Sequence, residues 1–265
     1  MSDTHPPCGE VRTLGSITVV IPVLNDAAML ERALACLAAQ MRPADEVIVV
    51  DNGSSDDSAA IAAAAGAVVI SQPTTGIWPA AAAGYDAARG DIIARIDADS
   101  RVPIDWLLHI EAEFTDSPDV GVLTGPGDFY DGNGFVTLLG QNLYIGGYFW
   151  AMSLWLGNTP VFGSNFAMRR DVWLEVRGRV HSDLRTVHDD LDLSMHLPLD
   201  AVVRLDDTLR VGISARPFAS WSTLGRRLGW AYLTLRLHWP EQTPWHRRLE
   251  RARLAADEDG LTGAA

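Results

Sequence analysis

Cysteine is scarce in this chain of 265 residues, which contains only two. Cys8 lies in a polar, proline-rich start and Cys36 on the apolar face of a predicted helix, so the pair is not the disulfide framework of a small secreted protein. The first dozen residues also lack the basic start and apolar run of a secretory signal. These absences favour a cytoplasmic protein stabilised by a hydrophobic core, for which a 48% hydrophobic composition suffices.

Positive charge is scarce as well, because the net charge is -13. Such a chain would repel a phosphate backbone, and it has no nucleic-acid recognition motif, so nucleic acid is excluded as a partner. The exception is segment 216–253, where eight arginines and only two acids interleave with tryptophans. We expect amphipathic helices there. They either lie at a membrane surface or pack on the rest of the protein with their arginines paired to its acids.

Strands and helices alternate through the first hundred residues. Short apolar runs predict strands at 17–23, 46–51, 67–71 and 92–96. This alternation specifies an α/β fold with right-handed crossovers and a mainly parallel, Rossmann-like sheet covered by helices on both faces. Asp26, Asp51 and Asp97 follow the ends of three strands, so we expect them at one edge of the sheet, where open α/β sheets bind ligands.

The triplet Asp97-Ala98-Asp99 follows the last of these strands. Two carboxylates at this spacing can hold a divalent cation against a diphosphate, and hard oxygen ligands suit Mg2+ or Mn2+. On its own, an acid-x-acid triplet is also typical of a solvated turn or a helix cap. The rest of the sequence therefore has to decide between these interpretations.

Four motifs in a fixed order resemble those of the family 2 glycosyltransferases, which have the GT-A fold. They are Pro22-Val23-Leu24-Asn25-Asp26, Asp51-Asn52-Gly53-Ser54-Ser55-Asp56, the pair Asp97 and Asp99, and Asp189-Asp190-Leu191-Asp192-Leu193. The resemblance runs from about residue 17 to residue 211. It implies an inverting enzyme that transfers a sugar from a nucleoside diphosphate, as in a UDP- or GDP-sugar, to a hydroxyl with the help of Mn2+ or Mg2+.

The resemblance also implies a role for each of these positions. Asp99 is expected to bind the metal directly, and Asp97 to reach the metal or the ribose. Asp190 is expected to be the general base, a contribution worth roughly 100 to 10,000-fold in rate. Residues implied to bind the nucleotide sugar are Pro22, Asn25, Asp26, Asp51, Gly76, Asp97 and Ala98. Residues implied to bind the acceptor are Gly163, Ser164, Asn165 and Asp189.

Other interpretations stay open at some of these positions. The acids at 189, 190 and 192 are also typical of an ordinary helix start, favoured by the positive end of the helix dipole. Relatives often have an Arg-Asn pair before the glycine of the third helix, where this chain reads Ala81-Ala82-Ala83-Gly84. This leaves the base undetermined and allows a non-catalytic relative acting in binding or assembly. A sugar nucleotidyltransferase is less favoured, because the first loop has neither a glycine nor a basic residue.

The apolar stretch between Asp131 and Arg169 contains no charged residue. A membrane span there would separate Asp97 and Asp99 from Asp190 by a bilayer. We therefore predict a buried or interfacial helix beside the acceptor pocket. Such a helix suits a lipid-linked or cell-envelope acceptor and association with the inner face of the membrane.

The sequence indicates a role for several single residues less strongly. His181, His188, His238 and His246 could each complete a metal shell, but a lone histidine is more often structural and none is assigned. Trp78 is expected in the core. Arg216 resembles a position that reaches the diphosphate.

The expected organisation is a disordered tail (1–14), a nucleotide-binding half (15–100), an acceptor half (101–215), a basic helical extension (216–256) and a second tail (257–265).

Overall fold

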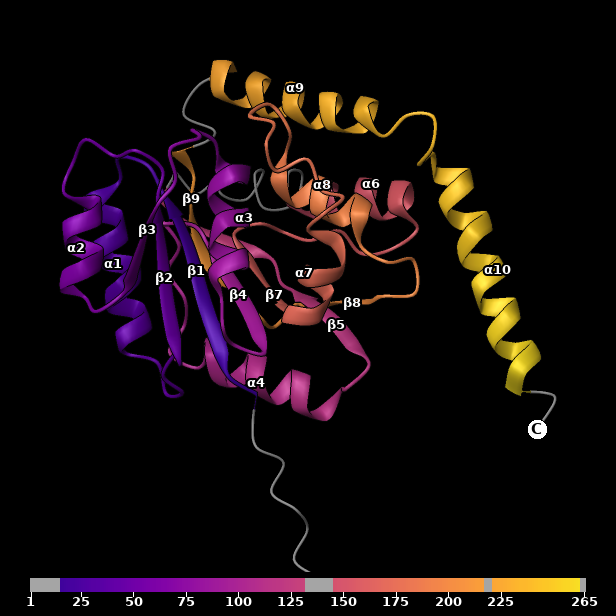
Figure 1. The fold of residues 1–265 in the computed structure, drawn as a ribbon, viewed down its shortest axis with the longest axis horizontal. Coiled ribbons are helices and arrows are strands. Elements are labelled where there is room, and N and C mark those ends of the chain that lie inside the picture. The colour runs from indigo at the N-terminus through magenta and orange to yellow at the C-terminus, as the bar shows by residue number, and fades with distance from the viewer. Residues whose placement is uncertain (1–14, 132–144, 217–220, 263–265) are drawn as a thin grey trace, which may run out of the picture.

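The computed structural model describes residues 15–131, 145–216 and 221–262. Its centre is a seven-stranded sheet in the order β3-β2-β1-β4-β7-β5-β8 (Figure 1). The strands are β1 (Ile17–Val23), β2 (Glu46–Asp51), β3 (Val68–Ser71), β4 (Ile92–Ile96), β5 (Val120–Thr124), β7 (Asn165–Arg169) and β8 (Val202–Leu205). Only β7 runs antiparallel to both of its neighbours. The predicted mainly parallel α/β fold is therefore confirmed.

Helices cover both faces of the sheet, because the side chains of a strand point alternately to opposite faces. In β1, Ile17, Val19 and Ile21 pack with helices α1 and α4, whereas Val20 packs with α3 and α7. The helices of this part are α1 (Ala27–Ala38), α2 (Ser58–Ala64), α3 (Ile77–Ala87), α4 (Trp106–Asp116), α7 (Arg170–Val176) and α8 (Asp189–His196). Burial on both faces explains why the strands are continuous apolar runs.

Helix α3 lies unusually close to the sheet. A Cβ atom added at Gly84 would stand 2.3 Å from Cγ1 of Val20. Ala80 and Ala81 on the same helix are also fully buried. Small residues are therefore required at this contact, as expected for an alanine-rich packing surface, and Ala81 and Ala82 face the core rather than a ligand.

Two parallel strands, β6 (Gly127–Asp131) and β9 (Val211–Ser214), form a second small sheet. It joins the main sheet through the bridge between Arg101, which follows β4, and Gly212 in β9. Because β9 ends next to the carboxyl edge of the main sheet, it delivers Arg216 to that edge.

The C-terminal extension consists of α9 (Trp221–Leu237) and α10 (Pro244–Thr262), which contact α8 and α6 (Gly146–Leu156) respectively (Figure 1). Arg247, Arg248 and Arg251 donate hydrogen bonds to backbone carbonyls at the end of α6, at distances of 3.0, 2.6 and 2.9 Å. The extension does pack on the domain, but these arginines bind the unpaired carbonyls of a helix end instead of the predicted acids.

No helix among the described residues has both the length and the apolar character needed to cross a bilayer. The apolar stretch supplies α6, whose Phe149 is buried and whose Trp150 is exposed, while residues 132–144 lie outside the described residues. The predicted N-terminal tail lies outside them as well. At the other end, α10 continues to Thr262, beyond the boundary at which the sequence predicts a tail.

Candidate active site

A pocket of about 390 Å³ opens at the carboxyl edge of the sheet. Its wall combines the ends of β1 and β4, the turn before β7, the start of α8 and the end of β9. Nine of the residues implied by the family resemblance line it: Pro22, Asp26, Asp97, Ala98, Asp99, Gly163, Ser164, Asp189 and Asp190. Residues separated by more than 160 positions in the chain therefore share one cavity.

Asp97 is held in one orientation by two neighbours. Its Oδ1 accepts a hydrogen bond from Nη2 of Arg95 at 2.9 Å, and its Oδ2 accepts one from the hydroxyl of Ser164 at 2.6 Å. Ser164 comes from the turn before β7, so this contact joins the two sides of the pocket. The carboxylate remains 38% exposed and accessible to a ligand.

Arg95 is a buried cation next to the last residue of β4, and its side chain is only 3% exposed. Besides Asp97 it contacts Asp189, with 2.7 Å between Nη1 and Oδ2. A buried charge is tolerated only when it is paired, and Arg95 supplies the positive charge for both acids. Burial still raises the pKa of Asp189 despite the attraction of Arg95, and the negative charge of Asp190 adds to the rise.

Asp190 has a different environment. Its Oδ2 accepts a hydrogen bond from the backbone N–H of Gly163 at 3.0 Å, and its Oδ1 is in close contact with Nδ1 of His188. Burial acts to raise the pKa of Asp190, but His188, the Gly163 N–H and Arg95 outweigh it and hold the pKa at about 2. Asp190 is therefore an anion at neutral pH. A side chain at residue 163 would be 2.5 Å from Arg95, so glycine is required there.

Asp99 faces Asp26 across the pocket mouth, and Arg216 lies between them. Nη2 of Arg216 is 2.5 Å from Oδ2 of Asp26 and 2.7 Å from Oδ2 of Asp99. Asp26 precedes α1 but its side chain makes no capping hydrogen bond, because the carboxylate is paired with Arg216 instead. Burial raises the pKa of Asp99, and the charge of Asp97 adds to the effect.

The donor set fits a divalent cation. Asp97 and Asp99 both present carboxylate oxygens to the pocket, and oxygen ligands suit Mg2+ and Mn2+. Burial raises the pKa of Asp99, so a nearby positive charge stabilises its ionised carboxylate. Arg216 supplies part of that charge in this structure.

A second pocket of about 320 Å³ adjoins the first and shares Pro22 and Ile77 with it. Gly76, implied to bind the nucleotide, lines this second pocket. Its N–H donates to Oδ1 of Asn52 at 2.6 Å, and the amide of Asn52 donates to the carbonyls of Gln72 and Thr74. Asn52 therefore holds the loop that shapes this end of the site.

Three residues implied by the resemblance line neither pocket. Asn165 is fully buried, and its amide group bonds to Trp106, Leu209 and Pro126. The side chain of Asn25 accepts hydrogen bonds from Ser55, and Asp51 accepts one from the N–H of Ser54. In this structure all three shape loops or the core.

Two groups that organise the site, Arg95 and His188, are not predicted from the sequence. An arginine within a buried strand needs acidic partners, so Arg95 does leave a signal in the sequence. The sequence offers His188 only as a possible metal ligand. The aromatic side of the pocket, formed by Phe129, Tyr148 and Phe162, gave no signal in the sequence, since apolar residues from three distant segments meet there.

A mainly parallel α/β sheet with an acidic pocket at its carboxyl edge is the architecture of the GT-A glycosyltransferases. The chain belongs to glycosyl transferase family 2, because the model of that family matches residues 18–177. The family predicted from the four motifs is thus confirmed, and the chain is a glycosyltransferase by class.

Solved structures support the same fold. A mannosyltransferase from Pyrobaculum calidifontis, in complex with GDP-Man and Mn2+, is 19% identical with a TM-score of 0.62, over 85% of this chain and 65% of that chain. Glucosyl-3-phosphoglycerate synthase from Mycobacterium tuberculosis, in complex with Mn2+, UDP and glucosyl-3-phosphoglycerate, is 22% identical with a TM-score of 0.57. The match covers 84% of this chain and 80% of that chain.

TarS 1-349 from S. aureus is 18% identical with a TM-score of 0.59, over 76% of this chain, and this chain spans only 61% of that one. At these identities the likeness establishes the fold alone. The comparison with curated proteins gave no match.

Proposed function

We propose that this protein transfers a sugar from a nucleoside-diphosphate sugar to an acceptor hydroxyl, with inversion at the sugar carbon and with Mn2+ or Mg2+ bound. The observation that carries the proposal is the shared pocket. Asp97 and Asp99 enter it from the end of β4, and Asp190 enters it from the start of α8. In this proposal residues 15–100 bind the nucleotide and residues 101–215 bind the acceptor.

Asp99, with Asp97, is proposed to hold the divalent cation. Once bound, the cation would stabilise the negative charge that develops on the departing diphosphate. Support comes from the solved structures of similar fold that contain Mn2+ together with UDP or GDP-Man. Arg216 is proposed to turn from Asp99 to the diphosphate when the donor binds, because its guanidinium already lies at the mouth of the pocket.

Asp190 is proposed as the general base. Its pKa of about 2 keeps it ionised, so it accepts the hydroxyl proton late, when bond formation to the sugar carbon has made the acceptor oxygen strongly acidic. The Gly163 N–H fixes one carboxylate oxygen and His188 contacts the other, which together orient the base. Asp189 is proposed to position the acceptor next to it.

An acceptor with an apolar part, lipid-linked or from a cell-envelope glycan, is proposed on two grounds. Phe129, Tyr148 and Phe162 line the pocket. In addition, Trp239 and Trp245 in the arginine-rich extension are 54% and 65% exposed. Aromatic and basic groups together suit the headgroup region of a membrane, so the protein is proposed to act from the cytoplasmic side at the inner membrane face.

The test combines binding and turnover. Mn2+ with UDP or GDP should raise the melting temperature, because a ligand bound only by the native state stabilises it. Asp99→Asn should abolish the metal-dependent part of this shift. Asp190→Asn should retain the shift but lower donor turnover by roughly 100 to 10,000-fold.

Asp116→Asn is the control, because Asp116 is exposed at the end of α4 and lines neither pocket. A metal-dependent shift that survives in Asp99→Asn would place the cation elsewhere. Metal-dependent donor binding without turnover of any donor would instead favour a non-catalytic binding or assembly protein.

A further inference from the structure

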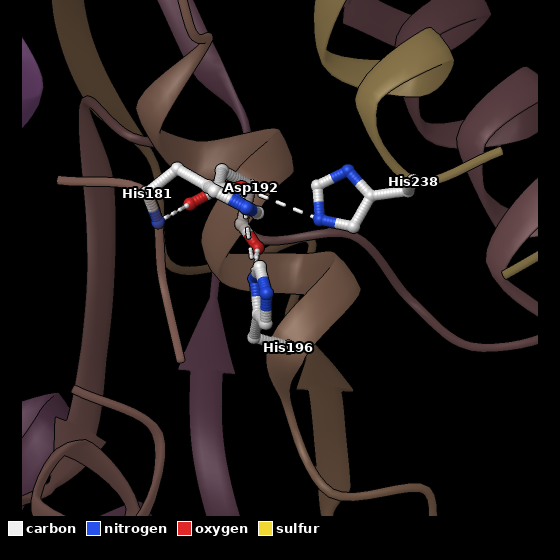
Figure 2. Close-up of side chains that lie close together, drawn as sticks. All are labelled: His181, Asp192, His196 and His238. Carbon is white, nitrogen blue, oxygen red and sulfur yellow. Dashed lines mark hydrogen bonds and ion pairs between the residues drawn. The ribbon is translucent and has the colours of Figure 1, made fainter. Parts of the chain in front are cut away.

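Three histidines and one aspartate converge on the side of α8 away from the active site. His181 comes from the segment before α8, Asp192 and His196 from α8 itself, and His238 from the residue after α9 (Figure 2). One ligand atom of each residue lies within 4.8 Å of the others. The centroids of the three imidazole rings are 4.9 to 5.3 Å apart. His181 and His238, which the sequence offered only as single histidines, are therefore neighbours in the fold, together with His196.

The Asp192 carboxylate is fully buried, and its two oxygens differ. Oδ2 accepts hydrogen bonds from Nε1 of Trp78 at 2.9 Å and from the backbone N–H of His181 at 2.8 Å. Oδ1 instead faces the histidines, at 2.9 Å from Nδ1 of His181, 3.4 Å from Nε2 of His238 and 3.6 Å from Nδ1 of His196. One oxygen is thus satisfied by N–H donors, and the other points into the imidazole cluster.

One ring nitrogen of His238 is left without a hydrogen-bond partner inside the cluster. Its Nδ1 lies 2.8 Å from the carbonyl of Thr234, which can only accept, so Nδ1 carries the hydrogen. In a neutral ring, Nε2 is then a bare acceptor. It is buried without a hydrogen-bond partner, on a side chain that is 3% exposed, and it faces the anionic Oδ1 of Asp192. Two acceptors facing each other in the interior repel unless a metal ion or a proton lies between them.

We propose that His181, Asp192, His196 and His238 form a zinc site. A tetrahedral site with bonds of about 2.0 to 2.1 Å has ligand-to-ligand edges of about 3.3 Å, close to the distances of 2.9 and 3.4 Å from Oδ1 to Nδ1 of His181 and to Nε2 of His238. Nδ1 of His196 lies 2.8 Å from the carbonyl of Asp192 and so carries a hydrogen, which means that His196 would bind the ion through Nε2. Imidazole and carboxylate donors suit Zn2+. The bond from His238 to the Thr234 carbonyl is the kind of outer contact that fixes a zinc-binding imidazole.

Solvent reaches the cluster from the His181 side. His181 is 33% exposed at the side chain and gives the ion a path from solvent.

The site has a structural role. Four protein ligands close the coordination shell and leave no position for a substrate, which is typical of structural zinc. The ion would join the segment before α8, α8 itself and the end of α9. Because α8 begins with Asp189 and Asp190, the ion fixes the helix that presents the proposed base and anchors the C-terminal extension to it.

The test measures zinc directly and needs no transferase activity, so its outcome is independent of the proposed function. The full chain is stripped with a chelator, incubated with ZnCl2, desalted and analysed by elemental mass spectrometry. One zinc per chain is expected in the wild type and in Asp99→Asn. Co2+ in place of zinc should give the intense visible absorption of a tetrahedral site.

His238→Gln and His196→Gln should each lower the zinc affinity by at least about tenfold, measured by competition with a coloured chelator. His246→Gln is the matched control, because His246 is exposed on α10 and outside the cluster. The proposal is overturned if the wild type, after reloading with ZnCl2 and desalting, retains no zinc or if Co2+ gives only a weak octahedral spectrum. Unchanged affinity in both cluster variants would also overturn it. A proton would then be what joins His238 to Asp192.

Discussion

Nη2 of Arg216 lies 2.7 Å from Oδ2 of Asp99, although 117 positions separate the two residues in the chain. The same nitrogen contacts Asp26 at 2.5 Å. Arg216 and a divalent cation would therefore compete for the same carboxylate oxygen. Arg216 should therefore weaken the binding of Mn2+ alone, but strengthen the binding of a nucleoside diphosphate with Mn2+.

Arg216→Gln should bind Mn2+ alone more tightly and UDP or GDP with Mn2+ more weakly. The first effect follows from removing a competing positive charge, and the second from losing a cation near the diphosphate. Because the Arg216 side chain is 46% exposed, each change should be modest, about two- to fivefold. Isothermal titration with Mn2+ and with the nucleotide gives both values, and a change of the same sign in both would contradict the competition.

The affinity for Mn2+ should fall on acidification at a higher pH than for an ordinary aspartate. Burial and Asp97 raise the pKa of Asp99, and the cation needs the ionised carboxylate. Protons therefore compete with the cation as the pH falls through this raised pKa. Arg216→Gln removes a neighbour that lowers the pKa, so its midpoint should move to still higher pH. Titrations at several pH values test this, and an unmoved midpoint would show that another group limits binding.

Gly163→Ala should lower both stability and turnover. The added methyl group would stand 2.5 Å from Nη1 of Arg95 and 3.1 Å from Oδ2 of Asp190. Arg95 cannot move freely, because it is buried and contacts Asp97 and Asp189. Overpacking of this kind costs about 1 to 3 kcal/mol, measurable by denaturant unfolding.

The matched control for this substitution is Gly178→Ala, because nothing lies within 4 Å of a Cβ atom at residue 178. Its stability and turnover should stay close to those of the wild type. Equal behaviour of the two alanine variants would mean that the turn before β7 adapts without disturbing Arg95 or Asp190.

Vesicles containing anionic lipid should sediment the wild-type protein. The double variant Trp239→Ser/Trp245→Ser should sediment less, because two exposed aromatic side chains are removed from the basic extension. Met41→Ser/Ile104→Ser is the control, since Met41 and Ile104 are equally exposed but lie outside the extension. Wild-type protein that stays wholly in the supernatant would leave packing on α6 and α8 as the role of the extension.

The sequence predicted four of the seven strands of the main sheet, because burial on both faces gives each of these four a continuous apolar run. The predicted strands at 17–23, 46–51 and 92–96 agree with β1, β2 and β4, and only β3 begins one residue later than expected. The positions of Asp26 and Asp97 followed from the same rule, since parallel strands end at one edge.

Contacts between distant segments could not be predicted in this way. Nothing local relates Arg216 to Asp26, and no spacing rule brings His238 to Asp192. Asn165 is the opposite case: the resemblance implies that it binds the acceptor, but its side-chain amide donates to the buried carbonyls of Pro126 and Leu209. Periodicity reports which face of an element is buried, but not which side chain of another element meets it.

Helix α8 is only eight residues long, and Asp190 and Asp192 stand two residues apart on it. At 3.6 residues per turn, two such side chains leave the helix in nearly opposite directions. Asp190 enters the pocket at the sheet edge, while Asp192 bonds to Trp78 and faces the histidines behind it. Rotating this helix to adjust one carboxylate would pull the other from its buried partners, so the proposed base cannot be repositioned by a turn of α8 alone.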